Sequence, residues 1–140
     1  MRKFLMIIMA TLLMVACQSA SNVEYSEAQN YFFRNDAKIP SSLKITSKQQ
    51  FDSYFGMAAV MGKNGQPTEI DFNRQFVIAK VLPVTDVETE LKLRTLTEED
   101  NRLVADFQVI RGQKQSWSMQ PFLILIVDRK YVDRDVMEKQ

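Results

Sequence analysis

The sequence predicts an α+β domain, a mostly antiparallel, curved sheet of about five to seven strands with one short amphipathic helix packed on it. Two short runs, at residues 75–82 and 122–127, are almost entirely apolar, which is typical of strands covered on both faces. Between them, residues 87–94 and 103–110 follow the alternating pattern of half-buried strands. A clear helix signal occurs at one place, after Ser47.

The first sixteen residues have the layout of a secretory signal peptide. Arg2 and Lys3 precede an apolar stretch, residues 4–16, in which Thr11 is the only polar side chain. As a helix this stretch would span about 20 Å, which is less than the roughly 30 Å hydrocarbon core of a membrane. We therefore expect cleavage of residues 1–16 rather than a permanent membrane span.

Met14-Val15-Ala16-Cys17 resembles the lipobox of bacterial lipoproteins, in which a small residue precedes the cysteine that receives lipid. The resemblance implies a diacylglyceryl group on the sulfur of Cys17 and a further acyl chain, such as palmitate, on the new amino terminus. Each buried methylene would add about 0.8 kcal/mol of membrane affinity. We expect a lipid anchor in the bacterial cell envelope and favour the outer membrane over the inner. The alternative is an unlipidated cysteine in a plain signal peptide or signal anchor.

The composition excludes several classes of protein. The 140 residues carry 18 Lys and Arg against 17 Asp and Glu, and this balance excludes a basic nucleic-acid-binding protein. Since the sequence has no His and Cys17 is its only cysteine, disulfides, Cys/His zinc sites, Cys–His nucleophiles and the Ser–His–Asp triad are excluded. We therefore predict no catalytic residue, no metal site and no cofactor.

The predicted organisation after the signal peptide is a tether, one domain and a tail. Residues 18–22 are small and polar, and with the lipidated cysteine they predict a flexible tether over residues 17–27. The single domain is expected at 28–134, with extended segments at 30–34 and 43–45. The charged tail, residues 135–140, is expected to fray.

The helix prediction depends on a capping box. Ser47 is followed three positions later by Gln50, and Phe51, Tyr54 and Phe55 then share one face. Gly56 is the expected C-terminal stop. We expect the three rings to pack on the sheet, the alternative being that they stack on a ligand.

Loops and turns separate the remaining elements. Residues 57–68 contain Gly, Asn-Gly and Pro and predict a mobile loop. A turn at 97–101 joins the two alternating strands, and a second turn at 111–114 is expected to return the chain toward the last apolar strand.

Few side chains could carry chemistry. Glu88 and Glu90 lie two apart on one predicted strand face, about 7 Å apart, where two carboxylates could act as acid and base or hold calcium. Lys92 and Arg94 continue the same row, so a solvated face of alternating charge explains all four residues better. Asp71 precedes a buried strand, where its side chain is expected to form a turn.

Trp117 is the strongest candidate for a surface binding residue. It lies near Met119, Arg111 and Lys114, and an aromatic anchor beside cations is typical of interface hot spots. The alternative is that the ring closes the end of the sheet.

One further set of motifs points to a family. The Ser-initiated helix at 47–55, the run Pro67 to Phe72, the apolar strand at 76–81 and the final strand after Pro121 resemble the PrcB C-terminal-type domain over residues 43–128. That family consists of small exported, often lipid-anchored bacterial modules, named for an accessory subunit that stabilises a surface protease complex. The resemblance implies a non-catalytic role in protein interaction and carries over Asp71 and Phe72, as structural residues.

Three classes of function stay open. The leading interpretation is an envelope lipoprotein that binds a protein partner or stabilises a complex. A lipoprotein that binds a carbohydrate or small ligand is the alternative, based on Trp117 and on a cavity under the loop at 57–68. An enzyme that uses only carboxylates is the third.

Overall fold

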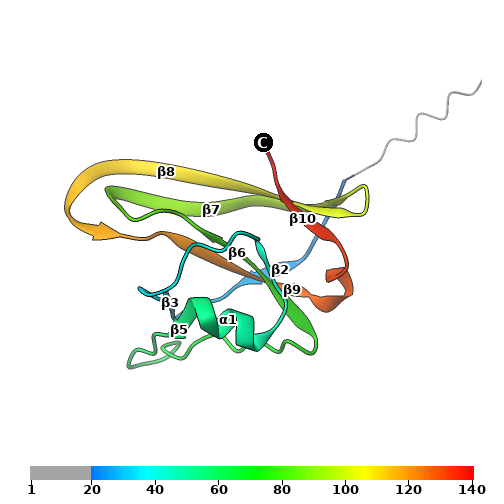
Figure 1. Ribbon diagram of the computed structural model, residues 1–140, viewed down its shortest axis with the longest axis horizontal. Coiled ribbons are helices and arrows are strands. Elements are labelled where there is room, and N and C mark those ends of the chain that lie inside the picture. Colours follow the sequence, from blue (N-terminus) through cyan, green and yellow to red (C-terminus); the bar gives the residue numbers. More distant parts are fainter. Residues whose placement is uncertain (1–19) are drawn as a thin grey trace, which may run out of the picture.

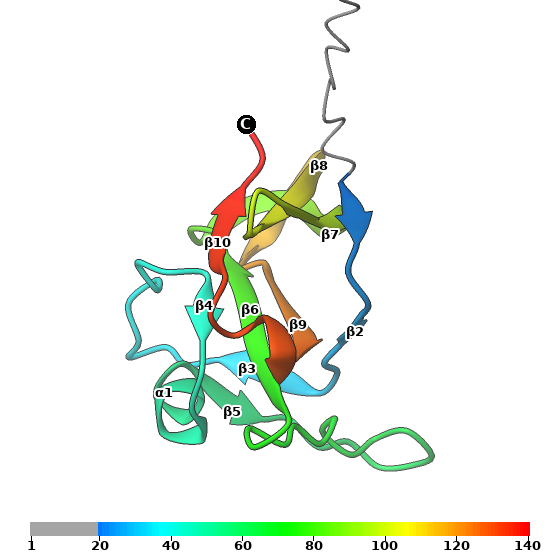
Figure 2. The same cartoon turned by 90° about the vertical axis from the view of Figure 1, so that its right-hand side faces the viewer.

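The computed structural model describes residues 20–140, so the predicted signal peptide and Cys17 lie outside the described residues. Three layers are stacked, as Figure 1 and Figure 2 show from two sides. The first is a sheet in the order β1 (Ser21–Asn22), β7 (Thr85–Glu99), β8 (Arg102–Met119) and β10 (Asp135–Glu138). The second is a sheet in the order β2 (Tyr25–Glu27), β9 (Phe122–Asp128), β6 (Gln75–Val81) and β4 (Lys44–Ile45). The third combines the pair β3 (Tyr31–Phe33) and β5 (Phe55–Met57) with helix α1 (Lys48–Tyr54). A 3-10 turn, η1 (Arg129–Tyr131), precedes β10.

The β6–β9 pair forms the centre of the molecule and has both faces covered, as the apolar runs predict. Phe76 and Ile78 point into a core shared with β7 and β8. Val77 and Ala79 point to the opposite side, into a core shared with α1 and β5. The alternation of a strand thus places neighbouring apolar residues in two separate cores. The prediction of a mainly β, largely antiparallel fold with one α-helix is confirmed.

Helix α1 begins where the capping box predicts. The N–H of Gln50 donates to the Ser47 hydroxyl at 3.1 Å, and Phe51 is buried on the inner face of the helix. The end of the helix differs from the prediction, because Gly56 is no helix stop but a residue of β5. The chain passes directly from α1 into β5, which pairs with β3, and this tertiary pairing fixes where the helix ends.

Strands β7 and β8 form a long hairpin with a two-residue turn at Asp100–Asn101. Both turn residues have positive φ, 51° and 63°, as a type I′ turn requires. The predicted alternation is present through Leu93, after which a bulge shifts the register and brings Leu96 inward.

The second predicted turn, at 111–114, is wrong. β8 continues through these residues as one strand of 18 residues, since β7 is long enough to pair with it as far as Lys114. The register shifts twice in this part of the hairpin. Two residues of β8 lie between Arg111 and Lys114, the partners of Thr89 and Val87, and four lie between Lys114 and Met119, the partners of Val87 and Thr85. The chain returns to the central sheet after Met119, and Figure 1 shows the curved hairpin above that sheet.

Both ends of the domain extend further than predicted. Ser21 pairs with Glu98 and Tyr25 pairs with Val127, so the expected tether at 17–27 is wrong from Ser21 onward. Val23 lies between these two short strands and is buried, which explains why the segment is structured rather than a flexible tether.

The tail at 135–140 does not fray over its first four residues. Residues 135–138 form β10, which pairs with β8 in parallel. An ion pair between Lys80 and Glu138, at 2.8 Å, fixes it across the layers. No helix within residues 20–140 is long and apolar enough to cross a membrane.

Candidate functional site

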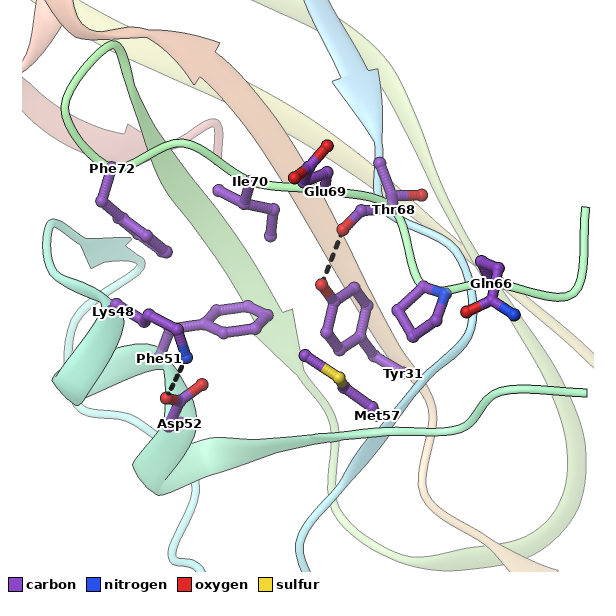
Figure 3. Close-up of a pocket in the computed structure, with 11 residues that line it drawn as sticks. Tyr31, Lys48, Phe51, Asp52, Met57, Gln66, Thr68, Glu69, Ile70 and Phe72 are labelled. Atoms are coloured by element: carbon purple, nitrogen blue, oxygen red, sulfur yellow. Dashed lines mark hydrogen bonds and ion pairs between the residues drawn. The ribbon is translucent and has the colours of Figure 1, made fainter.

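A pocket of about 540 Å³ lies between α1 and the segment that leads from the loop into β6 (Figure 3). Its lining comes from three separate parts of the chain: β3, helix α1 with the end of β5, and residues 66–72. The lining residues are Tyr31, Lys48, Phe51, Asp52, Met57, Gln66, Pro67, Thr68, Glu69, Ile70 and Phe72.

Three aromatic rings form the inner wall of this pocket. Tyr31 and Phe51 meet edge to face with their centroids 5.2 Å apart, and Phe72 lies 5.8 Å from Phe51. Figure 3 shows Ile70 and Met57 on opposite sides of these rings. The wall therefore offers apolar and aromatic surface to a ligand.

Several polar groups at the rim already have partners within the protein. The Tyr31 hydroxyl donates to the Thr68 carbonyl at 2.6 Å, and Lys48 forms an ion pair with Asp52 at 2.6 Å (Figure 3). The Thr68 hydroxyl accepts from the Gln29 N–H at 2.8 Å. This arrangement suits a ligand bound mainly through its apolar surface, with orientation provided by Glu69 and the ion pair.

Asn30 ties the loop to β3 and so shapes the pocket. Its backbone has a φ of 65°, in the left-handed region where Asn is tolerated. Its side-chain amide donates to the carbonyls of Asn64 and Gln66 at 2.8 and 2.9 Å. Residues 58–68 form no helix or strand, as predicted, yet these two hydrogen bonds hold the loop against the body.

Tyr31 provides a pH-dependent test of the pocket wall. Burial raises the pKa of its phenol, and the nearby Asp52 carboxylate adds to the rise while Lys48 opposes it. Since the folded protein keeps the phenol proton longer than the unfolded chain, stability falls as the pH rises above about 10. Near neutral pH, Tyr31→Phe should be less stable than the wild type by about 0.5–1.5 kcal/mol, because the Thr68 carbonyl loses its donor. Between neutral and alkaline pH, the stability of Tyr31→Phe should fall less than that of the wild type.

Urea unfolding of the wild type and Tyr31→Phe at about pH 7 and about pH 11 measures both effects. Tyr25→Phe is the matched control, since Tyr25 lies outside the pocket. If the free energy of unfolding fell equally from about pH 7 to about pH 11 in all three proteins, the Tyr31 phenol would have no part in the alkaline loss of stability.

The sequence-predicted binding residues lie elsewhere, on the hairpin. Trp117 is 56% exposed, and Met119 next to it is half-buried. The Arg111 guanidinium donates to the Thr89 hydroxyl across the strands at 2.7 Å, and Lys114 lies 3.6 Å from the Asp86 carboxylate. The structure therefore brings these residues onto one two-stranded ribbon and separates Trp117 from the pocket.

Glu88 and Glu90 have separate environments on the same hairpin. Glu90 forms an ion pair with Lys92 at 3.3 Å. The Glu88 carboxylate lies against Gly112, where an added Cβ would be 2.6 Å from Glu88 Oε2. Among the described residues, no three His, Cys, Asp or Glu side chains are grouped so as to hold a metal ion.

Asp71 and Phe72 organise the entry into β6. The Asp71 carboxylate accepts from the Asn73 N–H at 3.0 Å, which is a turn of the kind expected for this residue. Phe72 packs against the core beneath α1 and lines the pocket. The sequence does not identify Tyr31 as a pocket residue, nor Asn30 as the residue that ties the loop to β3, although an Asn before an aromatic run signals a left-handed turn.

No protein-family model, curated protein or solved structure matches the chain. The function of the site is therefore argued from its geometry and chemistry.

Proposed function

We propose that the chain is a non-catalytic lipoprotein of the bacterial envelope whose domain binds a protein partner and stabilises a complex. The residues of the hairpin that arch over the central sheet support this proposal. We call this part, residues 84–91 and 107–119, the ribbon. The resemblance to the PrcB C-terminal-type domain supports the same role, and a sequence without His or a second Cys offers few groups for catalysis near neutral pH.

The single observation that carries the proposal is the exposure of the ribbon. Six consecutive residues of β8, Val109 to Lys114, are exposed. A strand fully covered on one face shows alternating exposure, so consecutive exposed residues mean that neither face of this stretch of β8 is fully covered. Val84 and Trp117 add large exposed apolar side chains nearby. Exposed apolar surface rimmed by polar groups is typical of protein-binding sites.

Trp117→Ala should reduce the amount of co-purified partner at least about tenfold, because interface tryptophans commonly contribute more than 2 kcal/mol. The melting temperature should change little, since the ring is 56% exposed. Pull-down of the tagged lipoprotein from detergent extracts of the native envelope measures the first effect, and thermal unfolding the second.

Phe32→Ala is the matched control, because Phe32 is 48% exposed on the distant layer formed by β3 and β5. It should retain the partner. Equal recovery of the same partners with wild type and Trp117→Ala would show that Trp117 is not part of the binding site. Turnover of a peptide or glycan by the purified protein would show that the protein is not a non-catalytic binding module.

The pocket supports a second candidate, a lipoprotein that binds a small ligand. Its apolar wall favours an apolar ligand over a carbohydrate, because several polar groups at its rim are already paired within the protein. Trp117 does not line it. The neutral dye N-phenyl-1-naphthylamine should fluoresce on binding there. Ile70→Gln should abolish this signal, whereas Ile39→Gln, an exposed isoleucine outside the pocket, should leave it intact. No signal with the wild type would remove this candidate.

A further inference from the structure

One edge of β8 lacks a strand partner along the ribbon. Strand β10 pairs with β8 from Arg102 to Ala105, and the N–H of Lys139 extends this ladder by donating to the Ala105 carbonyl at 2.8 Å. Beyond that point no strand of residues 20–140 pairs with this edge, while β7 occupies the other edge as far as Lys114.

Unpaired strand edges are binding surfaces for backbone. In an antiparallel strand, alternate residues direct their N–H and C=O away from the existing partner, so about every second residue from Phe107 to Arg111 directs them outward. A register shift between Arg111 and Lys114 interrupts this alternation at the end of the edge. Monomeric proteins usually shorten, bend or cover such edges, because they pair readily with another chain. In Figure 1 no strand of the described residues lies alongside this part of the upper edge of β8.

The side chains along the edge suit an extended segment. Val109 and Ile110 are neighbours that point to opposite faces, and they are 41% and 40% exposed. An added strand would cover part of both side chains at once, whereas a partner docking on one face would cover only one of them.

The charge of the strand defines the partner further. From Phe107 to Met119 the sequence has no Asp or Glu, and Arg111 and Lys114 are its charged residues. The Lys114 side chain is 77% exposed despite its contact with Asp86. A second copy of β8 would bring two more cations to the same edge, which disfavours self-pairing.

We propose that the protein partner adds an extended, acidic segment as a further strand to the open edge of β8 between Phe107 and Lys114. This inference rests on the proposed function and names the mode of binding. Backbone hydrogen bonds provide the affinity, and Glu or Asp side chains opposite Arg111 and Lys114 provide the selectivity.

Two synthetic peptides of about nine residues test the chemistry of the partner. Both alternate Thr and Val, and one carries Glu where the other carries Lys. With the mature lipoprotein in detergent, the Glu peptide should slow hydrogen exchange of the outward amides in residues 107–114 at least about tenfold. The Lys peptide should not. No protection by the Glu peptide, equal protection by both, or concentration-dependent protection of the protein alone, as self-pairing gives, would overturn the proposal.

Two adjacent prolines test the role of the backbone. Of Val109→Pro and Ile110→Pro, one removes an N–H that points to β7 and should lower the melting temperature. The other removes an outward N–H and should keep the fold while abolishing peptide protection. Val109→Thr and Ile110→Thr keep both N–H groups and strand propensity, and are expected to retain protection.

The outcomes separate this inference from the proposed function. If an envelope partner still co-purifies with the folded proline variant, the protein-binding function stands and strand addition is wrong. If no envelope protein co-purifies with the wild type while the acidic peptide still protects the edge, the proposed function is wrong and the edge remains a peptide-binding site.

Discussion

Phe51→Ala is expected to destabilise the domain by about 3–5 kcal/mol, which is a large part of the roughly 5–15 kcal/mol by which a typical domain is stable. Phe51 is 3% exposed, and its ring lies 5.1 Å from that of Phe55 and 5.2 Å from that of Tyr31. Truncation would leave a cavity that these neighbours cannot fill without moving the helix.

The same ring couples α1 to the pocket. Phe72, which lines the opposite part of the wall, lies 5.8 Å from Phe51. Loss of Phe51 should therefore loosen the segment from 66 to 72 as well as the helix, and hydrogen exchange in both regions should accelerate together.

Urea unfolding measures the loss of stability, and Phe32→Ala is the control for the removal of an aromatic ring. Phe32 is 48% exposed, so its truncation should lower the free energy of unfolding much less than that of Phe51. A melting temperature of Phe51→Ala within a few degrees of wild type would show that the ring is no part of the core.

The sequence predicts the buried elements well because burial leaves a direct pattern. Runs in which odd and even positions are both apolar identify β6 and β9 as central strands. Ser47 with Gln50 identifies the start of α1. In each case the signal lies within a few neighbouring residues. The short strands β1 and β2 leave no such pattern, since they depend on pairing with strands far along the chain.

Two glycines explain the two errors in turn and helix prediction. Gly56 was expected to end the helix, but it pairs with Phe32 in β3 and the phenylalanine ring covers it. Gly112 was expected in a turn, but it lies in β8 beneath the Glu88 carboxylate. In both places glycine lets a side chain from the neighbouring strand lie over the backbone, which local sequence cannot reveal.

The candidate sites were predictable to different extents. The sequence indicates the ribbon as a candidate site through Trp117, because a tryptophan between two serines is conspicuous. The pocket was anticipated only as a cavity beneath the loop, since its wall joins Tyr31 to Thr68 through a hydrogen bond across 37 positions. The open edge of β8 depends on where β10 stops, which is a property of the topology.

Cys17→Ser is expected to remove the protein from the membrane fraction or to leave an unprocessed precursor. Lipidation of Cys17 is a prediction from the lipobox resemblance, and the residue lies outside the described residues. A single acyl chain binds membranes only weakly, whereas two or three chains anchor a protein stably, so loss of the acceptor sulfur should have an all-or-none effect. The fold should be unaffected, because the described N-terminal segment is held by Val23, which is buried and donates its N–H to the Leu96 carbonyl at 2.9 Å.

The structure also predicts how closely the lipid would hold the domain. The chain from Cys17 to Ser21 can reach at most about 14 Å, and Ser21 is already paired with Glu98 beside the β7–β8 turn. The lipid would therefore hold this end of the hairpin at the membrane. Metabolic labelling with palmitate and fractionation test the anchor, with Ser19→Ala as a neighbouring control that should keep its label. Labelling of Cys17→Ser at the wild-type level would place the acyl chains on another residue and would contradict the predicted lipidation of Cys17.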